Sequence, residues 1–414
     1  MGVHDHGASM RPSMAAALLC GLVGLGCQSE PGTSHGGAAP PPPTSPPPSA
    51  SSPEGPALVR AAAAELPATP TGPLRWTTRL VLPAPHRQPS YLLPTPSGLV
   101  VTASIDALGV DGAAVFRVEH GAARRLFEWQ GQGFLRAHWI DDRIVVPDAD
   151  APFGLGAIVQ LDLDGYVFIL DAADDPAAAQ REILPAVYHV FDVAVVDGRM
   201  VASTGAYVPG DLPYRSSRAP AALFVRGDKG RPWTRVLETP QVPAGTDTPV
   251  TRFTYLLSLD RGVLLAGLSH WDAAEVVRID GLPDAPRMHV ASGVAGETVR
   301  WERWGDRIVH LGLEGLAISH DGGRRFEPLV TPAVPHGVLA TKDALLVLCE
   351  GALFATGDGV EYRELAARDL ALDVPPTPLL HVPMAVQDGR LWAANPVTGA
   401  LLEAVAGAPV ITAR

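Results

Sequence analysis

The feature that most constrains this chain is a repeated pair of apolar, strand-length runs joined by a short turn that usually carries Asp and Arg. These turns stand at Asp141-Asp142-Arg143, Asp197-Gly198-Arg199, Asp260-Arg261-Gly262, Gly305-Asp306-Arg307, Lys342-Asp343 and Asp388-Gly389-Arg390, with Ser97-Gly98 as a first member. Asp and Gly tolerate the positive φ angles of a tight hairpin. The pattern recurs about every 40 to 65 residues with only strand-like sequence between, which is typical of a β-propeller.

Two stretches of the chain show how each repeat divides into strands. In one, we expect strands at 191–196, 200–204, 221–226 and 233–238, with residues 205–220 as an insertion between the middle strands. In another, we expect them at 299–304, 308–313, 316–319 and 326–330. Four strands make one propeller blade. Residues 75–414 are therefore predicted to form a single all-β domain, a β-propeller of about seven four-stranded blades, with six or eight as the alternatives.

A propeller has to close into a ring, because an open ring leaves a strand edge unpaired. Strands at 384–386, 391–394 and 401–405 are expected to form three members of the last blade. Either residues 76–82 or residues 409–414 supply the fourth strand, and the sequence leaves both alternatives open.

The N-terminus has the composition of a bacterial export signal. Residues 10–14 give a weakly positive start, and residues 15–25 form an apolar run too short to span a bilayer as a mature helix. We therefore expect residues 1–26 to be a signal peptide, with Met10 or Met14 as alternative starts.

The apolar run ends in Val23-Gly24-Leu25-Gly26-Cys27, which resembles a bacterial lipobox, where a small residue precedes the cysteine that is acylated. Gly24 and Leu25 depart from the residues usual at their positions, and ordinary secretion with cleavage nearby is the alternative. The resemblance implies lipidation of Cys27 and attachment to the membrane through acyl chains. Gln28 rather than Asp after the cysteine implies the outer membrane.

Residues 27–74 are predicted to be the lipidated cysteine and a disordered linker rich in Pro, Ala and Ser. The runs at 40–43 and 46–48 are all proline and favour extended polyproline II geometry, which cannot bury a core. Such a linker would hold the propeller away from a membrane. A ligand for a proline-binding domain is the alternative interpretation.

One turn between a third and a fourth strand matches a known motif in full. Ser319-His320-Asp321-Gly322-Gly323-Arg324-Arg325-Phe326 resembles the Asp-box, or BNR repeat, which reads Ser/Thr-x-Asp-x-Gly-x-x-aromatic. Two partial copies stand at equivalent places in other repeats. The expected Asp-box residues are Asp228, Gly230, Trp233, Ser319, Asp321, Gly323, Phe326, Thr356, Asp358, Gly359 and Tyr362. The Asp side chain can accept hydrogen bonds from backbone N–H groups within the turn, so the motif is a folding device.

The Asp-box resemblance implies a fold and leaves the function open, because the motif occurs in sialidases, other glycosidases, receptor ectodomains and photosystem assembly factors. The Arg-Ile-Pro motif of sialidases is absent, and neither their arginine cluster nor their Tyr/Glu pair can be assigned. Glycoside hydrolysis needs two carboxylates across the bond, and no spacing here selects a pair. We therefore expect a sialidase-like propeller without the sialidase active site, and no catalytic residues.

Two short motifs place a histidine near an aspartate, His189 with Asp192 and His138 with Asp141. Residues three apart on a regular strand face opposite sides, so neither pair should chelate an ion. His189 and Asp192 nevertheless fall in an innermost strand, and they are the candidate channel or binding residues. Cys349, at the end of an apolar run, is expected to be a small buried residue.

The net charge of −12 and the lack of a Lys/Arg cluster argue against nucleic acid as a partner. No metal-binding or cofactor-binding motif is found, so no metal or cofactor is expected. The leading hypothesis is a monomeric, non-catalytic envelope lipoprotein whose propeller is a platform for binding a protein or a glycan. The alternative is an envelope glycoside hydrolase or polysaccharide lyase. Acids and arginines converging at the channel mouth would favour the enzyme, and small apolar residues would favour the platform.

Overall fold

The computed structural model describes residues 67–70, 72–105, 112–129, 133–148, 165–171, 179–184, 187, 189–205, 220–227, 232–239, 252–269, 274–294, 296–374 and 381–406. The chain divides into two compact units, Met1–Glu54 and Gly55–Arg414, and all the described residues belong to the second. The expected signal peptide, Cys27 and most of the expected linker lie outside the described residues.

Antiparallel pairing arranges the described strands in successive sets of four. The first three sets are β2 (Gln88–Thr95), β3 (Gly98–Ser104), β4 (Ala113–Glu119) and β5 (Ala122–Trp129); β6 (His138–Ile140), β7 (Arg143–Pro147), β8 (Gly165–Asp171) and β9 (Gln180–Leu184); and β10 (His189–Val196), β11 (Arg199–Gly205), β12 (Ala222–Val225) and β13 (Thr234–Glu238). The next two are β14 (Arg252–Ser258), β15 (Leu264–Ser269), β16 (Ala274–Asp280) and β17 (Arg287–Val290); and β18 (Thr298–Trp304), β19 (Arg307–Gly312), β20 (Gly315–Ser319) and β21 (Glu327–Leu329).

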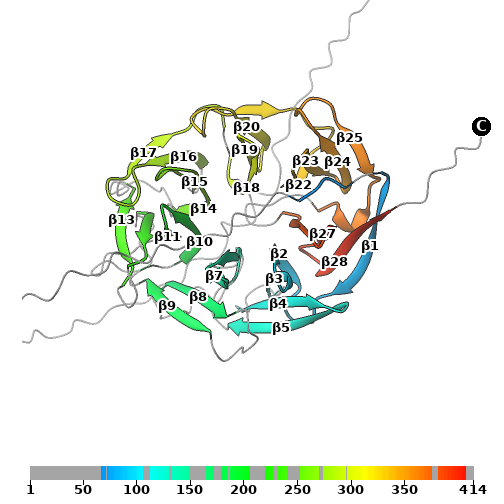
Figure 1. The fold of residues 1–414 in the computed structure, drawn as a ribbon, viewed down its shortest axis with the longest axis horizontal. Coiled ribbons are helices and arrows are strands. Elements are labelled where there is room, and N and C mark those ends of the chain that lie inside the picture. The colour runs from blue at the N-terminus through cyan, green and yellow to red at the C-terminus, as the bar shows by residue number, and fades with distance from the viewer. Residues whose placement is uncertain are drawn as a thin grey trace, which may run out of the picture. The chain divides into compact units, whose positions relative to one another are not determined.

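The last two sets complete the ring. They are β22 (Pro335–Ala340), β23 (Leu345–Cys349), β24 (Ala352–Thr356) and β25 (Arg363–Ala366); and β26 (Met384–Gln387), β27 (Arg390–Ala394), β28 (Ala400–Ala406) and β1 (Leu74–Val81). A short 3-10 helix, Leu370–Leu372, lies between them. Figure 1 shows the sheets arranged around a central axis, with β2, β10, β14, β18 and β22, the first strands that it labels, on the inner side of their sheets. The prediction of an all-β propeller is confirmed.

The turns that repeat in the sequence join the first and second strands of these sheets. Asp197 and Gly198 have φ angles of 45° and 74°, and Asp388 and Gly389 have φ angles of 51° and 72°. These left-handed conformations are the ones that Asp and Gly adopt at low cost in a two-residue hairpin. The need for positive φ angles therefore explains why Asp and Gly recur in the turns between paired strands.

The hydrophobic core is divided into clusters that lie between neighbouring sheets. Val309 of β19 and Val347 of β23, for example, pack in one cluster that joins the fifth and sixth sheets. Because neighbouring sheets cover both of its faces, the middle strands of a sheet are mostly buried, and β23 is apolar along its whole length. All five residues of β23, Leu345–Cys349, are buried.

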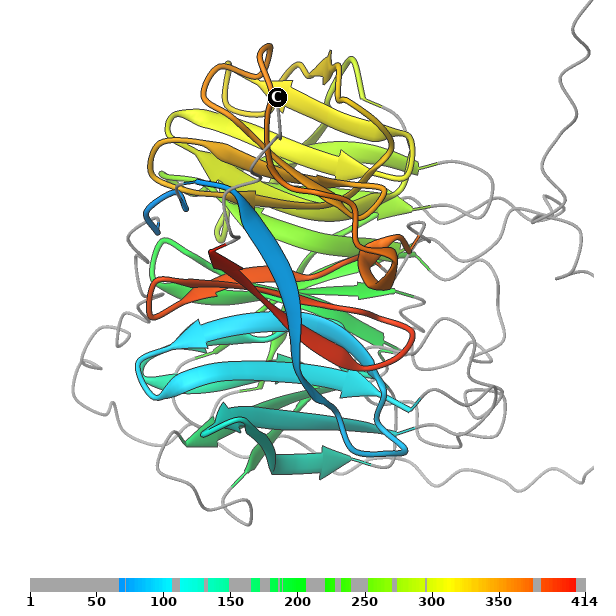
Figure 2. The ribbon, with the colours of Figure 1, turned by 90° about the vertical axis from the view of Figure 1, so that its right-hand side faces the viewer.

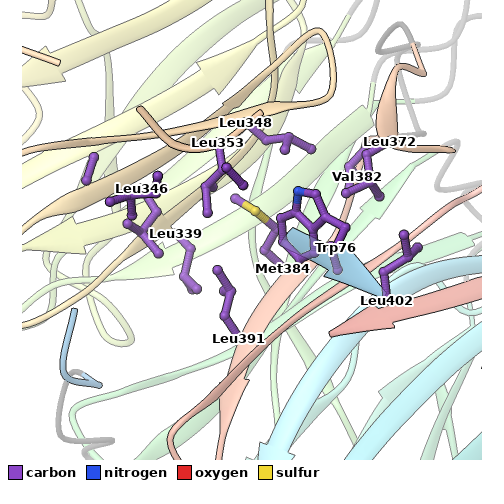
Figure 3. Close-up of a cluster of buried hydrophobic side chains, with 14 of the residues drawn as sticks. Trp76, Leu339, Leu346, Leu348, Leu353, Leu372, Val382, Met384, Leu391 and Leu402 are labelled. Carbon is purple, nitrogen blue, oxygen red and sulfur yellow. The ribbon is translucent and has the colours of Figure 1, made fainter. Parts of the chain in front are cut away.

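The ring is closed by β1, which is the outermost strand of the last sheet. It pairs antiparallel with β28 from Leu74 opposite Ala406 to Val81 opposite Ala400, and Figure 2 shows the two strands side by side. The Trp76 side chain points into a cluster that also contains Met384 and Leu402 (Figure 3). Of the two alternatives that the sequence leaves open, the N-terminal one is therefore observed as β1, while residues 409–414 lie outside the described residues.

Candidate functional site

The two predicted channel residues, His189 and Asp192, lie in β10, and first strands of neighbouring sheets contact one another around the axis (Figure 1). The expectation that their side chains face opposite sides of the strand is wrong. The register of β10 shifts after Val190, so that His189 pairs with Gly205 and Asp192 with Ser203. Because Gly205 and Ser203 are two residues apart, this bulge turns His189 and Asp192 toward the same face of the sheet.

Asp192 contacts the histidine of the other motif, His138 in β6. The Nε2 atom of His138 lies 2.6 Å from Oδ1 of Asp192. The same oxygen accepts a hydrogen bond from the Val193 N–H at 2.9 Å, and Oδ2 accepts one from the Leu256 N–H at 2.8 Å. The side chain of His138 is 25% exposed, and that of Asp192 is 3% exposed. A fixed, buried carboxylate therefore orients an imidazole ring that reaches solvent.

His189, by contrast, is an interior residue. Its ring lies 5.6 Å from that of Phe191, measured between centroids. Burial, and to a lesser extent the positive charge of Arg252, lowers the pKa of His189 to about 3. The imidazole is therefore neutral at physiological pH, and His189 does not line the pocket beside His138.

A pocket of about 580 Å³ opens beside His138, where four first strands end. We call it the mouth pocket. It is lined by residues in and next to β2, β6, β10 and β26: Tyr91, Leu93, Pro94, Thr95, Pro96, Ala137, His138, Trp139, Ile140, Ala194, Val195, Val386, Gln387 and Asp388. Most of this lining is apolar. At one edge, Gln387 accepts a hydrogen bond from the Thr95 N–H at 3.2 Å and donates one to Asp388 at 3.0 Å, so these polar groups satisfy one another.

Beyond the mouth pocket, two arginines and two tyrosines meet inside the ring. We call Tyr91, Arg136, Tyr255 and Arg300 the arginine–tyrosine layer. The Cζ atom of Arg136 lies 3.9 Å from the ring centroid of Tyr255 and 5.0 Å from that of Tyr91, and Cζ of Arg300 lies 5.4 Å from the Tyr91 centroid. Both guanidinium groups are buried. The layer therefore joins side chains of the first, second, fourth and fifth sheets across the axis.

Hydrogen bonds hold the two arginines to further strands. Arg136 Nη2 donates to the carbonyl of Val299 at 2.7 Å, and Arg300 Nη2 donates to the carbonyl of Met384 at 3.4 Å. Arg300 Nε also donates to Glu302 at 2.7 Å. Burial raises the pKa of Tyr255 to about 12, although the charge of Arg136 acts in the opposite direction. The Tyr255 hydroxyl is therefore neutral and presents an aromatic face to Arg136.

The sequence interpretation did not identify Arg136, Arg300 or their tyrosine partners as site residues. A weak signal was present, because Arg136 stands between Leu135 and Ala137, and Arg300 between Val299 and Trp301. A charged residue inside a buried strand or at its start usually has a specific partner. The tyrosine partners could not be read from the sequence, since they belong to other sheets.

The segment that resembles the Asp-box, residues 319–326, forms a turn held by Asp321 and Ser319. Oδ1 of Asp321 accepts hydrogen bonds from the N–H groups of Arg324 and Arg325, both at 3.0 Å, and Ser319 Oγ accepts one from the Gly323 N–H at 2.9 Å. Phe326 is buried between the fourth and fifth sheets. Partial burial would raise the pKa of Asp321, but the hydrogen bonds from Arg325, Ser319 and Arg324 hold it below its usual value.

The second turn, Thr356 to Tyr362, has the same pattern with one residue fewer. Asp358 accepts hydrogen bonds from the N–H groups of Val360 and Glu361 at 2.8 and 2.9 Å, and Thr356 accepts one from Gly359 at 2.8 Å. In the third copy, Asp228 and Gly230 lie outside the described residues, while Trp233 is buried and donates to Glu182 at 3.1 Å.

Cys349 is fully buried between the fifth and sixth sheets, as expected, and burial raises the pKa of its thiol to about 11. Within the described part of the chain, no group of three or more His, Cys, Asp or Glu residues is arranged to hold a metal ion. No helix of the same residues is both long and apolar enough to cross a bilayer.

No family model and no curated protein matches this sequence. Among solved structures, the virginiamycin B lyase of Staphylococcus aureus is similar with a TM-score of 0.51 and 11% identity, over 80% of this chain and 99% of that one. BamB from Moraxella catarrhalis is also similar, with a TM-score of 0.47 and 11% identity, over 84% of this chain and 98% of that one. The Pan2 WD40 domain of Neurospora crassa is similar with a TM-score of 0.47 and 11% identity, over 83% of this chain and 98% of that one. At such identities the likeness shows the β-propeller fold alone.

Proposed function

We propose that this chain is a non-catalytic, lipid-anchored protein of the bacterial cell envelope whose propeller binds a segment of another protein in the mouth pocket. The observation that carries the proposal is the chemistry of that pocket. Its volume of about 580 Å³ and its mostly apolar lining suit a few apolar side chains of a partner. Sugar recognition would need a larger number of polar groups directed into the pocket.

The aromatic and proline residues of the pocket are the expected energetic centre of binding. Trp139 and Tyr91 offer large, rigid surfaces. Trp and Tyr are among the residue types that contribute most of the binding energy at protein interfaces. Pro94 and Pro96 add rigid apolar surface that loses little entropy on binding. His138, Gln387 and Asp388 supply polar groups around this surface.

Site-specific cross-linking in cells tests the proposal. A photo-reactive residue at Pro96 should capture a partner protein, whereas the same residue at Glu327, which is exposed on β21 and outside the pocket, should not. With the purified partner, Trp139→Ala should weaken binding about 10-fold or more. Val330→Ala, at an exposed apolar residue outside the pocket, is the matched control and should bind normally. Equal capture at both positions, or full affinity of the Trp139 variant, contradicts a protein-binding pocket.

A second function, an envelope enzyme acting on sugar polymers, is favoured by one observation. A buried carboxylate that orients an exposed histidine, as Asp192 orients His138, is an arrangement that general acid–base catalysis uses. Turnover on a panel of glycans that disappears in Asp192→Ala would establish this function and overturn the non-catalytic proposal.

Anchoring through Cys27 is tested separately by membrane fractionation. The unmodified chain should partition with the outer membrane, and Cys27→Ser should shift to the soluble fraction because it lacks the acylated residue. If both chains partition in the same way, Cys27 does not anchor the protein. The cross-linking experiment then still tests the binding proposal separately.

A further inference from the structure

The arginine–tyrosine layer contains one positive charge that forms no ion pair with a described carboxylate. Arg300 is paired with Glu302 at 2.7 Å, and Arg252 nearby is paired with Glu297 at 2.5 Å. Within the described residues, no carboxylate lies within 4.0 Å of Arg136. Its side chain contacts a backbone carbonyl and two aromatic rings. Burying a cation without a counter-ion is costly, so a negatively charged partner is expected.

Three buried nitrogen atoms around this charge also lack hydrogen-bond partners among the described residues. They are Arg136 Nε, Arg300 Nη1 and His381 Nε2. His381 precedes Met384, whose carbonyl accepts from Arg300, so it lies at the same end of β26. Burial first, and then the charges of Arg136 and Arg300, lower the pKa of His381 well below its usual value. The ring is neutral, and in one tautomer its Nε2–H is a donor.

We propose that the arginine–tyrosine layer is a binding site for a small monovalent carboxylate, held by Arg136, Arg300 and His381. The planar donor fork of arginine matches the two oxygens of a carboxylate. One positive charge without an ion-pair partner matches one negative charge better than the two of a phosphate dianion. The faces of Tyr91 and Tyr255 suit the apolar remainder of an organic acid. The inference stands independently of the proposed function.

Tyr91 belongs to both this site and the mouth pocket. Its ring makes cation–π contacts with the guanidinium groups of Arg136 and Arg300, and its side chain also lines the mouth pocket. The mouth pocket and the proposed carboxylate site are therefore neighbours that share this side chain.

Calorimetry and thermal denaturation of the full chain test the site with acetate as the probe. Sodium acetate should raise the melting temperature saturably, and more than sodium chloride or sodium phosphate at equal ionic strength. Arg136→Gln should weaken acetate binding about 10-fold or more, because it removes a charge-assisted hydrogen bond. Arg307→Gln is the matched control, since Arg307 also stacks on an aromatic ring, 3.3 Å from the Trp304 centroid, and should bind acetate normally.

Three results would overturn the proposal. They are equal stabilisation of the unmodified chain by acetate and chloride, tighter binding of phosphate than acetate, and unchanged acetate binding by Arg136→Gln. If Arg136→Gln fails to fold, Arg136→Lys keeps the charge but loses the donor fork and should weaken binding several-fold. The comparison of salts on the unmodified chain needs no variant.

Discussion

Arg79 of β1 and Glu403 of β28 form an ion pair with an N–O distance of 2.6 Å, although 324 residues separate them in the sequence. The pair lies on the seam that closes the ring. The side chain of Arg79 is 42% exposed, so its charge is screened by solvent. Trp76, on the same strand, is buried in the cluster between the sixth and last sheets. Packing rather than charge should therefore hold the seam.

Trp76→Ala should lower the free energy of unfolding by about 3–5 kcal/mol, because it leaves a cavity under β1. Trp76 Nε1 has no hydrogen-bond partner among the described residues, so the loss is one of packing. Arg79→Ala should cost about 1 kcal/mol or less, since Glu403 keeps Arg390 at 3.7 Å. Urea denaturation of both variants measures the difference, and equal losses would show that the seam does not depend on Trp76.

Asp192→Asn should destabilise the protein by about 1–3 kcal/mol. The carboxylate accepts hydrogen bonds on both oxygens, from Leu256 N–H on one and from Val193 N–H on the other. In asparagine an NH₂ group replaces one of these two oxygens. That group would face a backbone N–H, so two donors would meet and one hydrogen bond would be lost. His138→Gln, at a more exposed residue that leaves both backbone hydrogen bonds in place, should cost less. Chemical denaturation of the two variants provides the comparison, and a larger loss for the His138 variant would contradict it.

Stability should decrease in acid partly through Asp321. Its pKa in the folded protein lies below the usual 3.8, so the carboxylate stabilises the fold above the unfolded-state pKa, and this contribution is lost as pH falls through the folded-state pKa. Asp321→Asn keeps one carbonyl acceptor but no charge. The stability difference between the unmodified chain and this variant should shrink between about pH 5 and pH 2. A difference that stays constant over this range would exclude the carboxylate as the cause.

Cys349 should resist thiol reagents in the folded protein. It is fully buried, and its pKa of about 11 leaves almost no thiolate at neutral pH. In a chain with Cys20→Ser and Cys27→Ser, labelling by a maleimide should require unfolding. Rapid labelling under native conditions would show that the sheets around it open readily.

The sequence could predict those parts of the fold that depend on neighbouring residues. The Asp197-Gly198 and Asp388-Gly389 turns require positive φ angles that these residues adopt, and the Asp321 turn is held by hydrogen bonds to residues within four positions. Strand limits were predicted to within one or two residues in most cases for the same reason.

The site could be predicted only in part, because it depends on contacts between sheets. Both the His138 and the Asp192 motif were recognised, but a regular strand was assumed for β10, and the bulge after Val190 changes which face Asp192 occupies. Arg136 and Tyr255 are 119 positions apart, and no local pattern relates them. Pairing of this kind is fixed by the order and spacing of the sheets.

The position of β1 in the last sheet has a consequence for how the chain folds. The entropy lost when two distant segments meet grows with the length of the intervening loop, and long-range contacts slow folding. The β1–β28 pairing spans almost the whole domain, whereas most other pairings join successive strands; β1 also pairs with β25, at Leu74 and Ala366, and β11 with β14, at Gly205 and Arg252. Ring assembly therefore has to wait until β28 has been synthesised, and until then the edge of β1 is open to aggregation or to a chaperone.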